Sequence, residues 1–209
     1  MAHTRRSQQR PLRTLVIIFS DGETELNYFE LKKRNIHGNR NIRIVTVQPN
    51  IKSPSQYIKY AEGYIQTHLP PLNGQDRIFC VFDVDTLSDS EIDNARNKLK
   101  LHKPLRSHMH LIHSNPDFEV WLLLHYRYLQ DSLGSQEATA KLRVFEKDYT
   151  KPNVENIFEN LMGNEHQALE NARRLRQYHQ ENGSNLFSTL TNPYTNVDEI
   201  VLFINSIRE

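Results

Sequence analysis

The stretch IFCVFDVD, residues 78–85, is an apolar run that ends in two aspartates. A run of β-favouring apolar residues bounded by polar ones predicts a buried strand of a parallel sheet. Residues two apart in a strand point the same way and lie roughly 6.6–7 Å apart along the chain. Asp83 and Asp85 are therefore expected to present two carboxylates at the carboxyl end of the strand, where open α/β sheets bind ligands.

Two neighbouring carboxylates have two interpretations. Because they repel each other, one must take up a proton unless a cation lies between them. Mg²⁺ prefers carboxylates together with water and phosphate oxygens, so it would remove the conflict. The alternative is a pair of surface aspartates with Asp85 capping the next helix, and a D-x-D motif alone does not decide between the two.

The composition bounds the class of protein. A chain of 209 residues forms one domain, or one domain with a small appendage. No apolar run approaches the ~20 residues that cross a bilayer, and the beginning lacks the apolar core of a secretory signal, so we expect no membrane association. The single cysteine, Cys80, fits a buried position and a reducing cytoplasm. The net charge of +1 means that any contact with nucleic acid must come from local basic patches.

The order of patterns predicts an α/β fold. Residues 1–13 carry four arginines and no apolar periodicity, which indicates a basic disordered tail. Residues 14–130 then alternate strand and helix patterns, which predicts a Rossmann-like domain with a mainly parallel four-stranded sheet flanked by helices. The strands are expected at 14–19, 41–47, 78–85 and 109–113, and the helices between them at 24–34, 53–69 and 88–101.

Residues 131–209 are expected to form a helical extension packed on the same core. Helical patterns occur at 137–146, 154–161, 165–181 and 196–207, and residues 192–196 are expected to form a turn.

Asp21 is a third carboxylate at a predicted strand tip. It lies in the acidic turn SDGETE that separates the first strand from the first helix. Glu23 and Glu25 have a simpler explanation, because acidic residues in a first helical turn are favoured by the helix dipole. We therefore expect Glu25 to stay with its own helix and Asp21 to converge with Asp83 and Asp85.

The stretch SNPDFEVWLLLHY, residues 114–126, is the second informative one. Asn-Pro indicates a turn, and Asp117 is a candidate cap for a buried helix that follows. Glu119 lies among apolar residues and needs a partner, because an unpaired buried charge is costly. That partner is either a backbone N–H at the helix start or another member of a functional site.

The aromatic residues of the 53–69 helix are assigned mainly to the core. Tyr57, Tyr60 and Tyr64 recur at roughly helical spacing, which packing against the sheet explains. No clustered set of exposed aromatics for base stacking is predicted, so the choice between RNA and DNA stays open.

Five motifs in order resemble the RloB family. They are D-G-x-T-E-x-x-Y-F at 21–29, F-D-x-D at 82–85, S-N-P-x-F-E-x-W-L-L-L-H at 114–125, Y-x-K at 149–151 and N-P-x-T-x-V at 192–197. The resemblance implies a Toprim-like fold and a Mg²⁺-dependent nuclease, for which Mn²⁺ can substitute, acting in prokaryotic anti-phage defence. It also implies a nucleic-acid partner, either RNA (tRNA included) or DNA, and a partner ATPase.

The resemblance assigns residues as follows. Asp83 and Asp85 match the D-x-D that holds the metal in Toprim domains. Asp21 falls where the family usually has a glutamate, and this shorter side chain puts the rate in doubt. Lys151 matches a family lysine that could contact the scissile phosphate. The expected catalytic set is thus Asp21, Asp83, Asp85 and Lys151, with the three aspartates as metal ligands.

Three further residues could support this site: Glu25, Asn115 and Glu119. Asn115 and Glu119 match family positions without a settled role, and Glu25 could compensate for the short Asp21. Two other functions compete with the nuclease: a non-catalytic subunit that keeps the scaffold to bind nucleic acid or a partner, and nucleotidyl transfer.

Overall fold

Strands and helices alternate through the first half of the chain, as the apolar runs predict. The computed structural model describes residues 13–36, 38–51 and 53–208, so the predicted tail at 1–13 lies almost wholly outside the described residues. The elements in order are β1 (Thr14–Ser20), α1 (Glu23–Asn35), β2 (Ile42–Val47), α2 (Gln56–His68), β3 (Arg77–Asp83), α3 (Asp89–Leu101) and β4 (Met109–Asn115).

The sheet has the order β2-β1-β3-β4-β5, and its first four strands are parallel. The predicted α/β class is confirmed. The turn expected at 192–196 is partly wrong, because β5 (Tyr194–Thr195) pairs antiparallel with β4. Asn196 secures this edge: its Oδ1 accepts from the backbone N–H of His113 at 2.8 Å, and its own N–H donates to the carbonyl of His113 at 3.3 Å.

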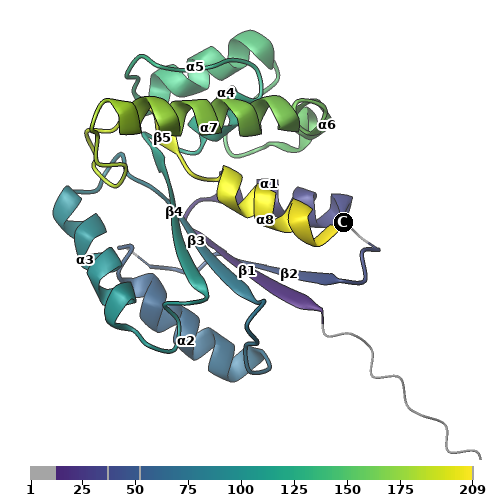
Figure 1. Ribbon diagram of the computed structural model, residues 1–209. Helices are drawn as coiled ribbons and strands as arrows, with labels where there is room; N and C mark the ends of the chain where they lie inside the picture. The colour runs from purple at the N-terminus through teal and green to yellow at the C-terminus, as the bar shows by residue number, and fades with distance from the viewer. Residues whose placement is uncertain (1–12, 37, 52, 209) are drawn as a thin grey trace, which may run out of the picture.

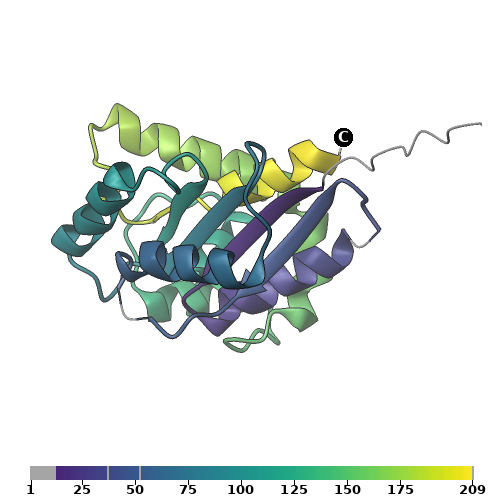
Figure 2. The ribbon, with the colours of Figure 1, turned by 90° about the horizontal axis from the view of Figure 1, so that it is seen from below.

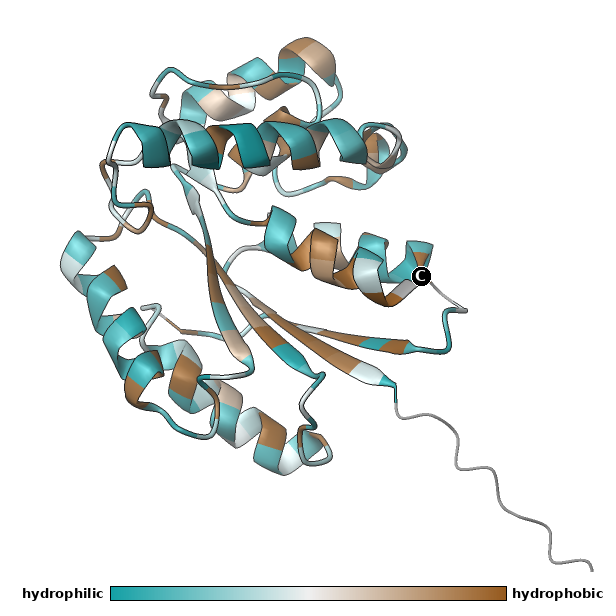
Figure 3. Ribbon diagram, viewed as in Figure 1, coloured by the Kyte–Doolittle hydropathy of each residue, from teal (hydrophilic) through white to brown (hydrophobic). Residues whose placement is uncertain are grey.

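Both faces of the sheet are covered by helices, which explains the continuous apolar runs of the strands. Figure 1 shows α2 and α3 on one face and α1 with α8 on the other, and Figure 2 shows the same layers from below. Successive residues of β1 serve opposite faces: Ile17 and Phe19 join the cluster under α2 and α3, and Val16 and Ile18 join the other cluster. The helix surfaces turned to the sheet are the apolar ones (Figure 3).

The second half of the chain is helical apart from β5. Its elements are α4 (Glu119–Leu124), α5 (Ser135–Phe145), the 3₁₀ turn η1 (Glu155–Ile157), α6 (Phe158–Gly163), α7 (Glu165–Glu181) and α8 (Asp198–Arg208). The helix expected at 154–161 is therefore a 3₁₀ turn followed by a short helix. Figure 1 shows α4 to α7 gathered beyond one end of the sheet, with α8 alongside α1.

One hydrophobic cluster joins the two halves. It contains Val16 of β1, Trp121 of α4, Leu175 of α7 and Ile204 of α8, all buried. Because α4 directly follows β4, this packing holds the helical part at the carboxyl ends of the strands. Within the described ranges, no helix is both long and apolar enough to cross a membrane.

Candidate active site

Acidic residues follow the ends of three neighbouring strands. Asp21 comes directly after β1, Asp83 is the last residue of β3, and Asp117 lies shortly after β4. Because these strands are parallel and adjacent, their carboxyl ends meet at one edge. The backbone N–H of Asp21 donates to the carbonyl of Val81 at 3.0 Å, which ties the two strand tips together. Asp21 and Asp83 line one small cavity of about 70 Å³, together with Tyr57.

Glu25 turns back from the first turn of α1 toward this edge. Its side chain is 2% exposed and lies over Gly22, so closely that a Cβ at Gly22 would collide with Glu25 Oε2. Glycine at this position therefore makes room for the carboxylate. The carboxylate of Glu25 therefore does not serve its own helix alone: its charge raises the pKa of Asp83, and the charges of Glu119 and Asp21 raise the pKa of Glu25 itself.

Glu119 is fully buried, and its partners are side chains. The phenol of Tyr149 donates to Oε1 at 2.7 Å, and the ammonium of Lys151 donates to Oε2 at 2.9 Å. Lys151 also lies 3.3 Å from Asp117 Oδ2. The partners of the Glu119 carboxylate are therefore side chains of the same cluster and not a backbone N–H at the helix start.

The segment that carries Lys151 is held against α1 and α5. Asn27 of α1 donates from Nδ2 to the carbonyl of Pro152 at 3.2 Å, and Arg143 of α5 donates from Nε to the carbonyl of Tyr149 at 3.0 Å. The lysine side chain is 46% exposed although both carboxylates that it contacts are buried. Its ammonium therefore has one side on the acidic cluster and one side toward solvent.

Burial and mutual repulsion shift the pKa values of these carboxyl groups upward. Burial raises the pKa of Glu25 to about 7, and the charges of Glu119 and Asp21 add to the effect. Burial raises the pKa of Asp117 to about 8, with a further rise from Glu119. Burial likewise raises the pKa of Asp83 well above its usual range, with Glu25 next in effect.

Lys151 offsets part of this repulsion. Burial lowers the pKa of Lys151, but the negative charge of Glu119 and the hydrogen bond to it outweigh burial and raise the pKa overall. The ammonium therefore stays charged at neutral pH. It also lowers the pKa values of Glu25, Asp83 and Asp117, although not enough to cancel the increases.

Asp85 lies at the outer border of the cluster. It is exposed, and its Oδ2 accepts a hydrogen bond from Ser135 Oγ at 3.3 Å. It is near enough to Asp21 for its charge to raise the pKa of Asp21, after the larger effect of partial desolvation. Asp85 therefore lies on the exposed side of the cluster, near Asp21, whereas Oδ1 of Asp83 is buried.

The residue types at this edge fit Mg²⁺, a hard cation that binds oxygen. Three buried carboxylate oxygens have no hydrogen-bond partner: Glu25 Oε1, Asp83 Oδ1 and Asp117 Oδ1. Such oxygens are costly in the folded state, and a bound cation would relieve that cost. However, nowhere in the described part of the chain do three or more His, Cys, Asp or Glu side chains already stand grouped for a metal ion. The predicted ligands Asp21, Asp83 and Asp85 share an edge without forming such a group.

Asn115 supports the site by holding a loop. Its Nδ2 donates to the carbonyls of Thr189 and Thr191 at 2.9 and 2.8 Å, and its Oδ1 accepts from Asn192 Nδ2 at 3.3 Å. These bonds tie the end of β4 to the loop that precedes β5. They use all the polar atoms of its side chain.

Sequence reasoning missed two members of the cluster. The sequence predicts Asp117 as a helix cap, but α4 begins two residues later and the Asp117 carboxylate contacts Lys151. Its position just beyond a predicted strand was the signal, the same one that identified Asp21. Tyr149 belongs to the Y-x-K motif with Lys151, and no local pattern indicates its hydrogen bond to Glu119.

Comparison with protein-family models gives one match that covers most of the chain. The model described as RloB-like protein matches residues 16–204, a range that includes every residue of the cluster. Comparison with curated proteins and with solved structures gave no match.

Proposed function

This chain belongs to the RloB-like protein family, and on that premise we propose that it is a metal-dependent nuclease that acts in prokaryotic anti-phage defence in the cytoplasm. Its substrate would be RNA, with tRNA as one candidate, or DNA, and an ATPase would be its partner. The observation that supports the proposal most is the cluster of buried carboxylates with unpartnered oxygens around Lys151. Buried, unpartnered carboxylates lower the stability of the folded state, so a functional role explains their presence better than a structural one.

Glu25 is the best-placed group to move a proton. Its pKa of about 7 leaves a large fraction of it ionised near neutral pH, so it can accept a proton from a water that attacks phosphorus. The family's usual glutamate is an aspartate here, Asp21, and Glu25 reaches the same edge from one helical turn further on. Glu25 thereby takes the role that the shorter Asp21 fills poorly.

Lys151 is the best-placed group to bind the scissile phosphate. It stays charged, and its half-exposed ammonium can contact a phosphate oxygen while Glu119 and Asp117 keep it in position. Tyr149 fixes Glu119 from the other side and so orients the lysine. A cation fixed in advance stabilises charge that develops in the transition state without reorganisation.

The aspartates at the strand tips would hold the metal ion. Asp21 and Asp83, which line one cavity, would supply carboxylate oxygens together with Asp85. A Mg²⁺ or Mn²⁺ ion bound there would supply positive charge to the phosphate oxygens and to the leaving oxygen.

The test is a cleavage assay with Asp83→Asn. End-labelled tRNA, single-stranded DNA and duplex DNA are incubated with Mg²⁺, with Mn²⁺ or with chelator. We expect the parent to cleave one of them only with metal, and Asp83→Asn to lose several orders of magnitude in rate. Asp93→Asn on the exposed surface of α3 is the matched control and should keep the parental rate. Cleavage by Asp83→Asn at the parental rate would refute the mechanism.

One observation favours a second function, a non-catalytic subunit that binds nucleic acid or a partner. Lys151 already neutralises part of the acidic cluster through Glu119 and Asp117, as expected of a site that no longer takes up a metal. Melting temperature discriminates the two functions, because a ligand that binds only the folded state raises it. If neither Mg²⁺ nor Mn²⁺ shifts the melting temperature and no substrate is cleaved, the second function is correct.

A further inference from the structure

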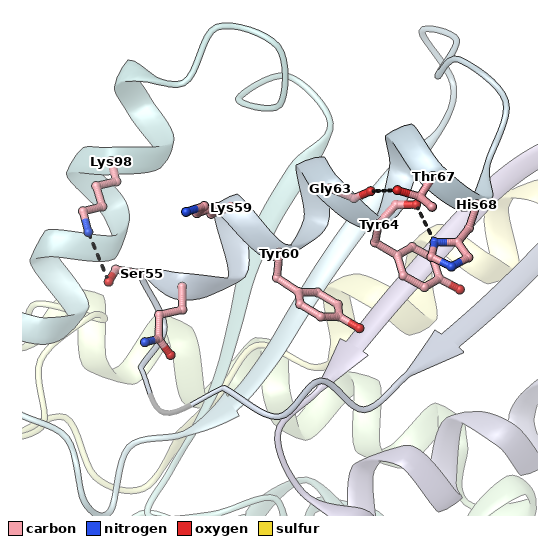
Figure 4. A pocket seen from close by; sticks show the side chains of 9 residues that line it. Ser55, Lys59, Tyr60, Gly63, Tyr64, Thr67, His68 and Lys98 are labelled. Carbon is pink, nitrogen blue, oxygen red and sulfur yellow. Dashed lines mark hydrogen bonds between the residues drawn. The ribbon is translucent and has the colours of Figure 1, made fainter.

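A groove of about 640 Å³ runs along the outer side of α2. Figure 4 shows three rings in a row along this helix: Tyr60, Tyr64 and His68. Neighbouring rings are nearly parallel, with centroids 6.2 Å apart for the first pair and 4.6 Å apart for the second. The expectation that core packing explains most of the tyrosines of this helix is confirmed: Tyr57 is buried, and Tyr60 and Tyr64 pack against the same cluster while staying partly exposed.

The rings are held in place from beneath. The buried ring of Phe19 in β1 packs edge-on against both Tyr60 and Tyr64, with centroids 5.5 and 5.6 Å away. His68 donates from Nδ1 to the carbonyl of Tyr64 at 3.1 Å. Because these contacts fix the orientation of the rings, a ligand that stacks on them needs little further ordering.

A glycine in the middle of α2 is a separate indication of a ligand. Gly63 lines the groove, and an added Cβ there would meet no atom within 4 Å. Its backbone does not have the positive φ that would require glycine. The fold would therefore be served better by alanine, which favours the helix. Glycine there leaves the helix backbone open to the close approach of a ligand.

The charged residues that line the groove favour a negatively charged ligand. Lys59 of α2 and Lys98 of α3 line it and are exposed, and Lys98 Nζ lies 3.4 Å from Ser55 Oγ. Among the residues that the structure describes, no acidic one lines the groove. Glu62, on the neighbouring surface, faces His102 at 3.4 Å. Aromatic faces combined with lysines are the features by which proteins bind single-stranded nucleic acid.

The groove begins near the acidic cluster, at residues adjacent in the chain to those that line its cavity. The small cavity with Asp21 and Asp83 is bordered by Pro54 and Tyr57 at the start of α2, and the groove begins at Ser55. A ligand that follows the helix outward from the cluster would pass the three rings in turn. The 13 residues of α2 make a track of about 20 Å.

We propose that the α2 groove binds single-stranded nucleic acid, with bases stacked on Tyr60, Tyr64 and His68 and with phosphates bound by Lys59 and Lys98. The idea that this groove delivers a strand to a nuclease site rests on the proposed function. The binding of single strands by the groove does not. Ten nucleotides at about 3.4 Å per stacked base exceed the length of the track. An oligonucleotide of that length is therefore sufficient as a probe.

The test measures binding in chelator, so that no cleavage occurs. Fluorescein-labelled U10, dT10 and a ten-base-pair duplex are titrated by fluorescence anisotropy at several salt concentrations. The key variant is Tyr60→Leu/Tyr64→Leu, which keeps an apolar cover on Phe19 and removes the aromatic faces. Controls are Tyr60→Phe/Tyr64→Phe, which keeps the rings, and Tyr178→Leu on α7. Circular dichroism melts establish that each variant is folded.

We expect single strands to bind more tightly than the duplex. The double leucine variant should weaken this binding roughly 5- to 150-fold for each base that loses its stacking partner, while the two controls bind as the parent does. Lys59→Gln and Lys98→Gln should each lower the salt slope by about 0.7. Gly63→Leu should weaken binding by filling the groove.

Binding by the double leucine variant as tight as that of the parent would overturn the proposal, as would a preference for duplex or no binding of any oligonucleotide. The same measurements separate this proposal from the proposed nuclease activity. If Asp83→Asn and the parent bind alike and neither cleaves, the groove binds single strands but the proposed nuclease activity is wrong. If the parent cleaves and the double leucine variant binds and cleaves equally well, the nuclease activity is supported and the proposed role of the groove is wrong.

Discussion

Replacing Glu25 by glutamine should make the protein more stable at alkaline pH. Burial and the neighbouring charges raise the pKa of Glu25 from 4.5 to about 7. A carboxyl group with a raised pKa binds its proton more tightly in the folded state, so folding loses stability as the pH rises. The loss begins above pH 4.5, where the unfolded chain ionises, and is complete above about pH 7.

The size of the effect follows from that shift. At about 1.36 kcal/mol per pKa unit, the change from 4.5 to about 7 is about 3 kcal/mol of unfolding free energy. Glutamine has nearly the same shape and no charge, so the Glu25→Gln variant escapes this loss. It should match the parent near pH 4.5 and exceed it by about 3 kcal/mol at pH 8. Removing this charge also lowers the raised pKa of Asp83, which reduces the stability that Asp83 costs and adds to the gain.

The assay is urea unfolding followed by circular dichroism between pH 4.5 and 8.5 in chelator. The control is Glu23→Gln, which removes an exposed glutamate from the same first turn of α1. Its unfolding free energy should keep the parental pH dependence. If Glu25→Gln also keeps that dependence, or is the less stable protein at pH 8, then Glu25 is not held among repelling charges and the electrostatic account of the site is wrong.

Three further changes test other parts of the structure. Lys151→Met leaves Glu119 buried without its counter-charge and should lower the unfolding free energy at pH 8 by about 1–3 kcal/mol. This range is smaller than for a fully buried pair because the lysine is half-exposed. A melting temperature equal to that of the parent would contradict the ion pair. Asn115→Ala leaves the carbonyls of Thr189 and Thr191 without their hydrogen-bond donor and should lower the unfolding free energy by about 2–4 kcal/mol. Amide hydrogen exchange should become faster in the loop at 189–191 alone. Unchanged exchange there would show that other contacts hold the loop. Gly63→Ala should raise the unfolding free energy by about 1 kcal/mol, measured by the urea midpoint, because α2 gains a better helix former without a clash; a loss of stability would mean that the glycine serves the fold after all.

The strand tips were the part of the site that sequence reasoning could reach. Apolar runs mark β1 and β3, and parallel neighbours end at the same edge, so Asp21 and Asp83 were placed there from their positions in the chain alone. The same reasoning would have reached Asp117, which follows β4, had its place before an apolar helix not suggested a cap. Periodicity also located α7 correctly at both ends, because its pattern is long and regular.

Other features depended on contacts between residues far apart in the chain. Lys151 and Glu119 meet across 32 positions, and β5 joins β4 across about eighty. No local pattern carries information about such pairs, because they form only when the helical part packs against the end of the sheet.

The sequence by itself determined the alternation of buried strands and amphipathic helices, and with it the edge where carboxylates gather, since both follow from the spacing of apolar residues. Only the tertiary structure decided which way side chains turn at that edge and on α2. Glu25 turns into the cluster because Gly22 leaves room for it, and Tyr64 lies partly exposed with its ring packed edge-on against Phe19. Such orientations depend on the volume and charge of neighbours that the linear order of residues does not reveal.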